Sequence, residues 1–502
     1  MDVLMHWLLF GKELITDVLV LMVFALLLAA AVYYLIDITQ TRHAVRRNYP
    51  VLGRFRYAFE HMGSFFRQYF FAMDRDEMPF NRAERSWVYR AAKNLDQTVA
   101  FGSTAHIHEP GSVVFSNGVF GVLEEEIQKP STVVVGPDCT HPYTAKSIFN
   151  ISGMSFGAIS KPAVLALSNG ARLAGCWMNT GEGGLSPWHL EGGADIVFQI
   201  GTAKYGVRDA NGNLSHEKLK AVAAHNNVRM FEIKLTQGAK PGKGGILPAV
   251  KVTDEIATIR GIPAHQASIS PNGHADIRNT QDLLDAIAEI RKITGKPVGI
   301  KTVLGGAAWV HELCRAISER GAQSAPDFFT LDGGDGGSGA APLSLIDNVG
   351  LPVSESLPML IDTLLEYNLK DRIKVNVSGK LVNPSHVAWA LCMGADFVSS
   401  ARGFMFSLGC IQSLQCNKNT CPTGIATHDE RLQKGLVVTD KTERVAHYAR
   451  NLMAEVEIIA HACGVTEPRQ LRRHHARVVM EDGLSVPLDE LHPYPAGHAL
   501  LD

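Results

Sequence analysis

Three of the eight cysteines lie close together in the segment CIQSLQCNKNTCPTG, residues 410–424. Cys410, Cys416 and Cys421 follow the spacing C-x5-C-x4-C, whereas the other five are scattered singly along the chain. Soft thiolates at such a spacing are typical ligands of iron–sulfur clusters or of zinc. Apart from His428, no further Cys or His lies within ten residues of the run. The segment therefore predicts a metal centre, with free thiols as the remaining alternative.

Glycine-rich stretches follow four apolar runs of the chain. Such stretches let the backbone approach a flat ligand and its phosphate closely, although any one of them could also be a tight turn. Their joint placement predicts a phosphate-bearing cofactor, to which two basic side chains would add positive charge. The stretches are Gly153-Met154-Ser155, Gly333-Gly334-Asp335-Gly336-Gly337, Gly379-Lys380 and Ala401-Arg402-Gly403.

Lys301 ends the apolar run PVGIKTV, where its ammonium group should point toward a ligand at the end of a strand. Beneath a flavin, a lysine would stabilise negative charge on the reduced ring. The alternative is an interior salt bridge to a carboxylate such as Glu182 or Asp335, because buried lysines need partners.

The loop LTQGAKPGKGGILPAVK, residues 235–251, is too long and too rich in Gly and Pro for a simple connection, so we expect it to form a rigid wall of a ligand site. Lys240 stands in it among small residues, and Arg260 closes the helix-like segment VTDEIATIR that follows. Two converging cations predict a carboxylate substrate, with Arg suited to a bidentate grip. Each cation taken alone could be a solvated surface charge.

Eight short runs rich in β-branched residues alternate with helix-length segments from residue 148 onward. This alternation predicts an α/β protein with a parallel (β/α)8 barrel, whose active site lies at the carboxyl ends of the strands. The rival architecture is a doubly wound open sheet. The segment DIVFQIGTAKYGV, residues 195–207, fits as an inserted hairpin. The eight runs are residues 148–154, 176–182, 230–235, 265–270, 297–303, 327–334, 373–379 and 396–403.

The N-terminal part contains a stretch of 19 residues, Val18 to Ile36, without a charge, proline or glycine. A helix of that length spans roughly 28 Å, close to the hydrocarbon core of a bilayer. We therefore expect a retained transmembrane anchor, with a cleaved signal peptide or a buried core helix as alternatives. Arginines follow the span, whereas Lys12 alone precedes it, which predicts a single-pass protein with its catalytic domain in the cytoplasm.

Composition narrows the class of protein. The chain of 502 residues is 46% hydrophobic and 20% charged, so it can bury a large core. The net charge of −2 does not produce the positive electrostatic potential that attracts a polyanion, so nucleic acid is not an expected partner. We expect an anchor over residues 1–40, a juxtamembrane helical extension over 41–140, the barrel over 141–465 and a peripheral tail over 466–502.

Several segments resemble the FMN-binding barrel domain of glutamate synthases, in the order found in that family. The resemblance covers about residues 140–465, and the long loop together with the cysteine spacing is its most specific part. The matching pieces are GMSFGAIS (153–160), NTGEGG (179–184), LTQGAKPGKGGILP (235–248), SISPNGHADI (268–277), DGGDGGSGAAPL (332–343) and the three-cysteine run.

The resemblance implies an oxidoreductase that reduces 2-iminoglutarate, formed from 2-oxoglutarate and ammonia, to L-glutamate. It implies a [3Fe-4S] cluster on Cys410, Cys416 and Cys421, and 2-oxoglutarate held by Lys240 and Arg260. Lys301 and Glu182 would be the catalytic residues, with Glu182 near the ammonia entrance. The FMN ligands implied are Gly153, Met154, Ser155, Gln237, Lys301, Gly336, Gly337, Gly379, Lys380 and Arg402.

The sequence also departs from the family pattern. We expect no counterpart of the amidotransferase domain and the β-helix of the large family members, and therefore ammonia from solution or from a separate glutaminase subunit. Ile246 replaces the usual Gln and Lys243 the usual Glu in the long loop. A different 2-oxo acid or an N-substituted amino acid is therefore an alternative substrate. A further alternative is a membrane-linked electron-transfer subunit. A ferredoxin or a reductase subunit would be the electron donor, because no GxGxxG motif follows a strand.

Overall fold

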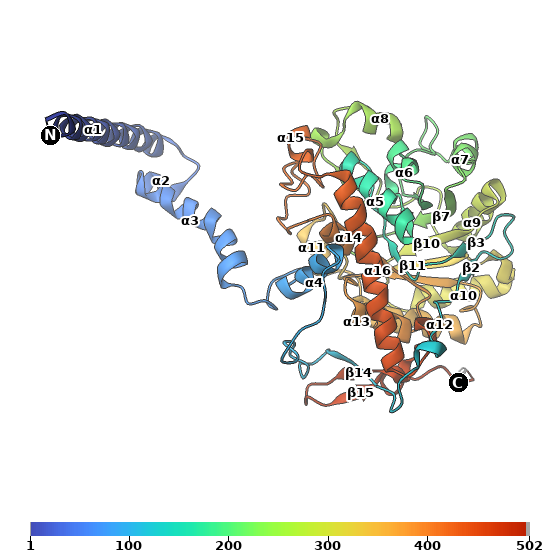
Figure 1. Ribbon diagram of the computed structural model, residues 1–502. Helices are drawn as coiled ribbons and strands as arrows, with labels where there is room; N and C mark the ends of the chain where they lie inside the picture. The colour runs from blue at the N-terminus through green and yellow to red at the C-terminus, as the bar shows by residue number, and fades with distance from the viewer. Residues whose placement is uncertain (1, 498–502) are drawn as a thin grey trace. The chain divides into compact units, whose positions relative to one another are not determined.

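The computed structural model describes residues 2–497. The chain divides into two compact units, of which the first ends at Ala83 and the second begins at Glu84. Figure 1 shows the order of the helices and strands along the chain. Each unit is described by itself.

The first unit is helical. It contains α1 (Asp2–Thr39), α2 (Ala44–Asn48), α3 (Leu52–Phe66) and the π-helical turn η1 (Arg67–Phe71). The stretch Met5–Thr39 of α1 is long and apolar enough to cross a bilayer, a property that signal sequences and core helices of soluble proteins share. Near its end, Asp37 accepts hydrogen bonds from Arg54 at 2.8 Å, which ties α1 to α3.

The second unit is built on a closed barrel of eight parallel strands, as the sequence predicts. The last strand pairs with the first, Val398 opposite Phe149, and thereby closes the barrel. Its strands in chain order are β4 (Phe149–Ile151), β5 (Trp177–Asn179), β6 (Asp195–Ile200), β7 (Val228–Lys234), β10 (Val298–Thr302), β11 (Phe328–Asp332), β12 (Lys374–Ser378) and β13 (Phe397–Ser400).

One strand of the barrel differs from the sequence-based prediction. Residues 195–200 form barrel strand β6 and are not part of an inserted hairpin. The run 265–270 lies outside the barrel, where β9 (Ser268–Ile269) pairs antiparallel with β8 (Ile246–Leu247). The physical reason is burial. Five consecutive residues of β6 are buried, as a strand covered on both faces requires, whereas β9 alternates between a buried and an exposed residue.

Helices follow the barrel strands, and local sequence signals set their ends. Helix α5, for example, begins after the N-cap Ser160 and ends before Gly175, whose φ of +75° suits the left-handed C-cap. The long helix α16 packs along α5. The main helices of this unit are α5 (Lys161–Ala174), α6 (Pro187–Glu191), α7 (His216–Ala223), α8 (Asp254–Arg260), α9 (Thr280–Thr294), α10 (Ala308–Arg320), α12 (Val353–Glu366), α13 (Pro384–Cys392), α14 (Arg402–Ser407), α15 (Glu430–Gln433) and α16 (Val438–Ala462).

The amino-terminal end of the barrel is plugged by a hairpin of β2 (Val133–Val135) and β3 (Tyr143–Ala145). Val135 and Tyr143 pack against strand residues such as Trp177, Phe328 and Phe397 in a buried apolar cluster. The tail from residue 466 pairs with an earlier segment, since β14 (Ala476–Val479) joins β1 (Val113–Phe115) and β15 (Ser485–Pro487) in a small sheet. Because the hairpin of β2 and β3 closes the amino-terminal end of the barrel, we expect a ligand to bind at the carboxyl ends of the strands.

Candidate active site

A cavity lies at the carboxyl ends of the barrel strands, with about 540 Å³ of empty space that includes its open mouth. Eight of the ten residues predicted to bind FMN line it, and Met154 and Ser155 directly follow the lining residue Gly153. The lining residues are Ser152, Gly153, Gln199, Lys234, Gln237, Lys301, Asp332, Gly336, Gly337, Ser378, Gly379, Lys380, Leu381, Val382, Ser399, Ser400, Ala401 and Arg402.

One side of this cavity has the properties of a phosphate cradle. A Cβ atom on Gly337 would lie 2.8 Å from Nε of Arg402, so glycine is required for the guanidinium group to come this close. Gly379 and Lys380, which line the cavity, have φ values of +147° and +49°. Positive φ values of this kind occur in tight turns and cluster at ligand sites. Burial lowers the pKa of Arg402 to about 10, which still leaves it charged at neutral pH. These residues fit the phosphate of FMN.

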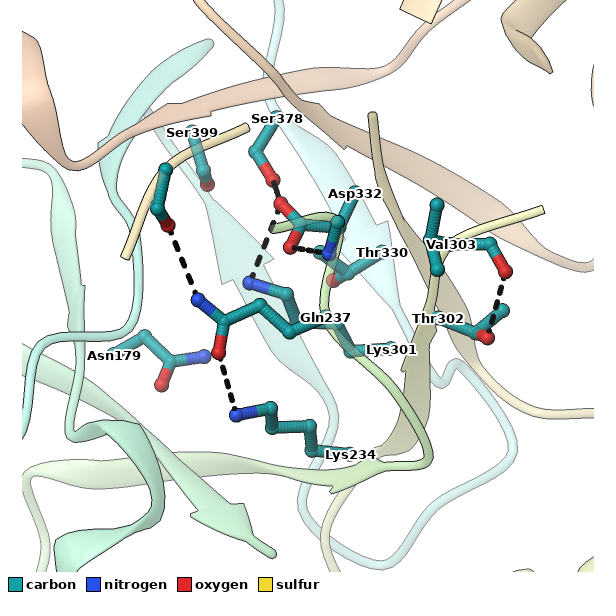
Figure 2. A network of polar contacts seen from close by, with 12 residues as sticks. Asn179, Lys234, Gln237, Lys301, Thr302, Val303, Thr330, Asp332, Ser378 and Ser399 are labelled. Atoms are coloured by element: carbon teal, nitrogen blue, oxygen red, sulfur yellow. Dashed lines mark hydrogen bonds and ion pairs between the residues drawn. The ribbon is translucent and has the colours of Figure 1, made fainter. Parts of the chain in front are cut away.

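Lys301 lies on β10 at the edge of the cavity, with its ammonium nitrogen 3.7 Å from Oδ1 of Asp332 (Figure 2). The partner is therefore Asp332 on the neighbouring strand, and not Glu182 or Asp335. Asp332 also accepts hydrogen bonds from the backbone N–H of Gly238 and from the hydroxyl of Ser378. Because these bonds hold its carboxylate in place, Lys301 keeps a defined position.

Beneath the cavity the barrel interior contains a layer of buried polar side chains. Glu232, which is 1% exposed, accepts hydrogen bonds from Asn179, Gln199 and Thr330 at 2.6 to 2.8 Å. Thr330 in turn accepts a hydrogen bond from the amide of Asn376. Gln199 also lines the cavity, so this layer forms its floor. We call these five residues the polar floor.

A chain of polar contacts leads from the cavity to Glu182. Lys234 donates a hydrogen bond to Glu182 at 2.9 Å and a second one to the side chain of Gln237 at 3.0 Å. The amide of Gln237 then donates to the carbonyl oxygen of Gly337 at 3.1 Å. Figure 2 shows Gln237 with its side-chain oxygen turned toward the nitrogen of Lys234. Lys234 is thus a site residue that the sequence reasoning missed.

Glu182 lies in a setting that keeps it ionised. Burial alone would raise its pKa, but Lys234, Lys240 and Arg260 together lower it below the usual value. A Cβ atom on Gly245 would lie 2.6 Å from an oxygen of this carboxylate, so the long loop approaches Glu182 directly. The structure therefore brings Glu182 into the same charge cluster as the two predicted substrate cations.

Lys240 is a mostly buried lysine whose ammonium group has no direct partner in the described residues. Its side chain is 4% exposed, and within residues 2–497 it makes no hydrogen bond or ion pair through its ammonium nitrogen. Burial and the neighbouring Lys234 lower its pKa to about 8, while Glu182 opposes this shift. A buried cation without a partner is costly, so its position favours an anionic ligand.

Arg260 is buried beside the same cluster. It donates a hydrogen bond to Ser268 at 3.1 Å and lies over the ring of Tyr205, but its Nε has no partner. Nearby, His274 bonds the carbonyl oxygen of Lys234 through Nε2, and its buried Nδ1 is also unpartnered. We call Glu182, Lys234, Lys240, Arg260 and His274 the charged mouth.

Position 246 borders the charged mouth. Ile246 is 36% exposed on β8, and it directly follows Gly245, the residue that approaches Glu182. Lys243 is exposed. Whether Ile246 changes the choice of substrate therefore stays a prediction.

The three cysteines of the segment 410–424 interact electrostatically with one another. Burial raises the pKa of Cys421, but the Thr423 hydroxyl and the backbone N–H groups of Ala426, Thr423 and Ile425 outweigh it and lower the pKa. Within residues 2–497 no group of three or more His, Cys, Asp or Glu side chains is placed so that it could hold a metal ion. By the chemistry of their donor atoms alone, the soft sulfurs and the N–H groups around Cys421 suit an iron–sulfur cluster.

The five scattered cysteines play a different part. All of them are buried, in agreement with the expectation that they are apolar packing residues. They are Cys139, Cys176, Cys314, Cys392 and Cys463.

Together, fold and site define an enzyme of the α/β-barrel class, with a cavity lined by glycines and basic side chains at the carboxyl ends of the strands and a buried charge cluster beside it. A family model described as the conserved region in glutamate synthase matches residues 116–466. The chain belongs to the glutamate synthase family and is an oxidoreductase of that family.

The relatives include proteins of similar and of greater length. The glutamate synthase large subunit-like protein YerD of Bacillus subtilis is 39% identical, over 91% of this chain and 94% of that protein. An archaeal-type glutamate synthase (NADPH) of Thermotoga maritima is 33% identical, over 70% of this chain and 66% of that protein. Among solved structures, mandelate oxidase with benzoyl-formic acid superposes with a TM-score of 0.46 at 14% identity, covering 78% of this chain and 98% of that one.

Proposed function

We propose that this protein is an FMN- and iron–sulfur-dependent glutamate-synthase-like enzyme that reduces 2-iminoglutarate to L-glutamate. Ammonia condenses with the carbonyl carbon of 2-oxoglutarate and releases water, which leaves a C=N bond. Addition of a hydride to the carbon and of a proton to the nitrogen then gives the amino acid. FMN bound in the barrel cavity would supply the hydride.

The charged mouth carries this proposal. Lys240 and Arg260 are both more than nine-tenths buried. Nε of Arg260 has no protein partner, and the ammonium group of Lys240 makes no hydrogen bond or ion pair within residues 2–497. Two such donors near one cavity suit the two carboxylates of a dicarboxylic keto acid, because charge-assisted hydrogen bonds of this kind are strong. An electron-transfer subunit would have no use for such a clamp, so we do not favour that alternative.

The remaining residues of the mouth would handle the nitrogen and its proton. Glu182, ionised beside three cations, would accept hydrogen bonds from the N–H groups of ammonia at its carboxylate and so orient the nitrogen lone pair for attack. Lys234 bonds both Glu182 and Gln237, and so would hold the carboxylate at a fixed distance from the flavin cavity. Lys301, held by Asp332, would place a positive charge beside the reduced flavin.

Cys410, Cys416 and Cys421 would hold a [3Fe-4S] cluster, which needs three thiolates. When bound, such a cluster supplies one-electron transfer. We propose that a ferredoxin or a reductase subunit delivers the electrons, and that ammonia comes from solution or from a separate glutaminase subunit. Ile246 and Lys243 support one alternative, in which a different 2-oxo acid or an N-substituted amino acid is the substrate.

We further propose that α1 anchors the protein in a membrane, with the barrel on the cytoplasmic side. The apolar stretch Met5–Thr39 supports this proposal, and so do the arginines Arg42, Arg46 and Arg47 that follow it. Removal of residues 1–40 should move the protein from the membrane fraction to the soluble fraction with its flavin still bound. A full-length protein that is already soluble would refute the anchor.

Anaerobic turnover tests the enzymatic proposal. The purified full-length protein should contain flavin and about three irons per chain, as expected for this cluster type. With ammonium, a chemically reduced electron carrier and a panel of 2-oxo acids, we expect 2-oxoglutarate to give the fastest amino-acid formation. Faster turnover of a monocarboxylic acid would support the alternative substrate, and zinc in place of iron would remove the cluster from the proposal.

A further inference from the structure

Lys251 is a fully buried lysine that lies outside the cavity. Its side chain is 1% exposed at the end of the turn η4 (Ala249–Lys251), and within residues 2–497 it forms no ion pair. Lysines are almost never fully buried unless they are paired, so this charge calls for a compensating group nearby.

The ammonium group of Lys251 joins two distant parts of the chain. It donates hydrogen bonds to the carbonyl oxygens of Ala158 at 2.7 Å, Ala426 at 3.1 Å and Cys416 at 3.3 Å. Ala158 belongs to the loop that follows β4, whereas Cys416 and Ala426 belong to the cysteine segment and its continuation. These three acceptors use all three donors of the ammonium group.

Further hydrogen bonds join the same two segments. Ser160 donates its hydroxyl to Gly424 at 2.7 Å and its backbone N–H to Ile425 at 2.8 Å. His428 contacts the carbonyl oxygen of Gly157 through Nε2 at 2.8 Å. The loop 155–160 is therefore fixed to the cysteine segment along most of its length.

The same loop also reaches the substrate cation. A Cβ atom on Gly157 would lie 3.2 Å from a terminal nitrogen of Arg260, so this loop and the guanidinium group are in close contact. At its other end the loop adjoins Gly153, which lines the flavin cavity. One short loop thus touches the cavity, the clamp and the cysteine segment.

We propose that Lys251 is a positioning residue that couples the cysteine segment to the flavin cavity and the clamp, and that its positive charge raises the reduction potential of the iron–sulfur cluster. This inference rests on the proposed cluster. Thiolates carry the negative charge that a buried cation needs, and reduction adds a further electron. A fixed positive charge in a medium of low polarity favours that more negative state.

The test compares two lysine replacements. Lys251→Met removes the charge and keeps the length of the side chain. Lys418→Met is the matched control, because it removes an exposed lysine from within the cysteine segment itself, where water screens the charge. Iron and flavin contents are measured first, and the midpoint potential of the cluster is then obtained by a redox titration followed by EPR.

We expect Lys251→Met to disfavour reduction of the cluster by about tenfold, which corresponds to a potential about 59 mV lower for one electron. The KM for the keto acid should rise as well, since the loop beside Arg260 loses its anchor. Lys418→Met should change neither quantity. An iron-containing Lys251→Met protein with the wild-type potential would overturn the charge role, whereas a wild-type protein without iron would overturn the cluster assignment and this inference together.

Ser160→Ala provides the second test, should Lys251→Met lose its iron or fail to fold. It breaks one hydrogen bond between the same two segments, together with the N-cap bond from Ala163, and leaves the charge of Lys251 in place. We expect an unchanged cluster potential and a KM for the keto acid raised about threefold, the effect of one neutral hydrogen bond. An unchanged KM would overturn the positioning role.

Discussion

The polar floor and the charged mouth are both buried clusters of polar side chains, but they differ in how their hydrogen bonds are satisfied. In the floor, the carboxylate of Glu232 accepts hydrogen bonds from three neighbours, and none of the five residues has a fully buried polar atom without a partner. In the mouth, Arg260 and His274 each have a fully buried nitrogen without a partner. The mostly buried Lys240 makes no hydrogen bond or ion pair through its ammonium group within residues 2–497.

This difference indicates that the polar floor stabilises the fold and that the charged mouth binds a ligand. A satisfied network stabilises the barrel by itself, because each buried donor has an acceptor. Unpartnered charges instead cost stability in the free protein, and that cost is recovered when a ligand of opposite charge binds. We therefore expect floor mutations to act mainly on stability and mouth mutations mainly on substrate binding.

The largest expected effect is a loss of stability caused by a replacement in the polar floor. Glu232→Ala leaves the donors of Asn179, Gln199 and Thr330 without their acceptor in the barrel interior. Each unsatisfied donor costs about 1–3 kcal/mol, so we expect the free energy of unfolding to fall by at least about 3 kcal/mol. Urea unfolding followed by circular dichroism measures this loss.

Glu232→Gln is the matched control for that variant. It keeps the volume and one acceptor oxygen, and we expect it to lose less than half as much stability. If Glu232→Ala unfolds at the wild-type urea concentration, the floor is not a structural network and the comparison fails.

In the mouth, Arg260→Met should act on binding and not on stability. One charged hydrogen-bond contact is worth about 1.5–3 kcal/mol, so the KM for 2-oxoglutarate should rise roughly 10- to 150-fold. Lys240→Met should raise the KM similarly and leave stability equal or higher, because it removes a buried charge without a partner. Steady-state kinetics and urea unfolding of the same samples check both statements.

The flavin absorbance spectrum is the control for these two variants, since neither residue lines the cofactor cavity. Glutamate formation that is insensitive to both replacements would contradict the carboxylate clamp.

Sequence patterns alone predict the barrel, because eight buried parallel strands need apolar runs separated by helices. They misassigned one strand: the run 265–270 (HQASIS) was counted as a barrel strand, and the more apolar run 195–200 (DIVFQI) as a hairpin. The strand pairing shows that the second of them, β6, belongs to the barrel. The residues that line the cavity could be predicted from the sequence, because glycines at strand ends indicate that the backbone approaches a ligand closely.

Other site residues were identified only once the fold was known. Lys234 ends a strand as Lys301 does, and the two are register partners on neighbouring strands, so the same signal was present but was not used. Asp332 carried it too, as the last residue of β11, whereas Lys251 gave no such signal. The role of Lys251 depends on contacts between segments far apart in the chain, which local patterns do not encode.

The mouth should also respond to pH, through Lys240. Its pKa is lowered to about 8, mainly by burial, so the cation that binds a carboxylate is lost above that value. The KM for the keto acid should rise above pH 8 and approach a tenfold increase per pH unit, whereas Lys240→Met should be flat over this range.

The same deprotonation of Lys240 that weakens substrate binding should stabilise the fold. The folded protein loses this proton near pH 8, while the unfolded chain holds it until its ordinary pKa near 10.5. The unfolded state therefore binds more protons in this interval, and this residue's contribution to stability rises with pH from about 8 to about 10.5. A KM profile of the wild type that matches that of Lys240→Met would assign the pH response to another group.

The smallest effect should come from the rim of the mouth, at Ile246. This residue is 36% exposed, so a polar side chain there can reach water and leaves no unsatisfied group. Ile246→Gln restores the residue usual in the family, and we expect glutamate formation to stay equal or to improve by about threefold at most, because discrimination by one pocket residue is modest. The ratio of kcat/KM for 2-oxoglutarate to that for a monocarboxylic 2-oxo acid measures the change. If Ile246 instead contacts an apolar group of a different native substrate, the same replacement should depress turnover of that substrate. That result would show that position 246 belongs with the binding residues of the mouth and that 2-oxoglutarate is not the native keto acid.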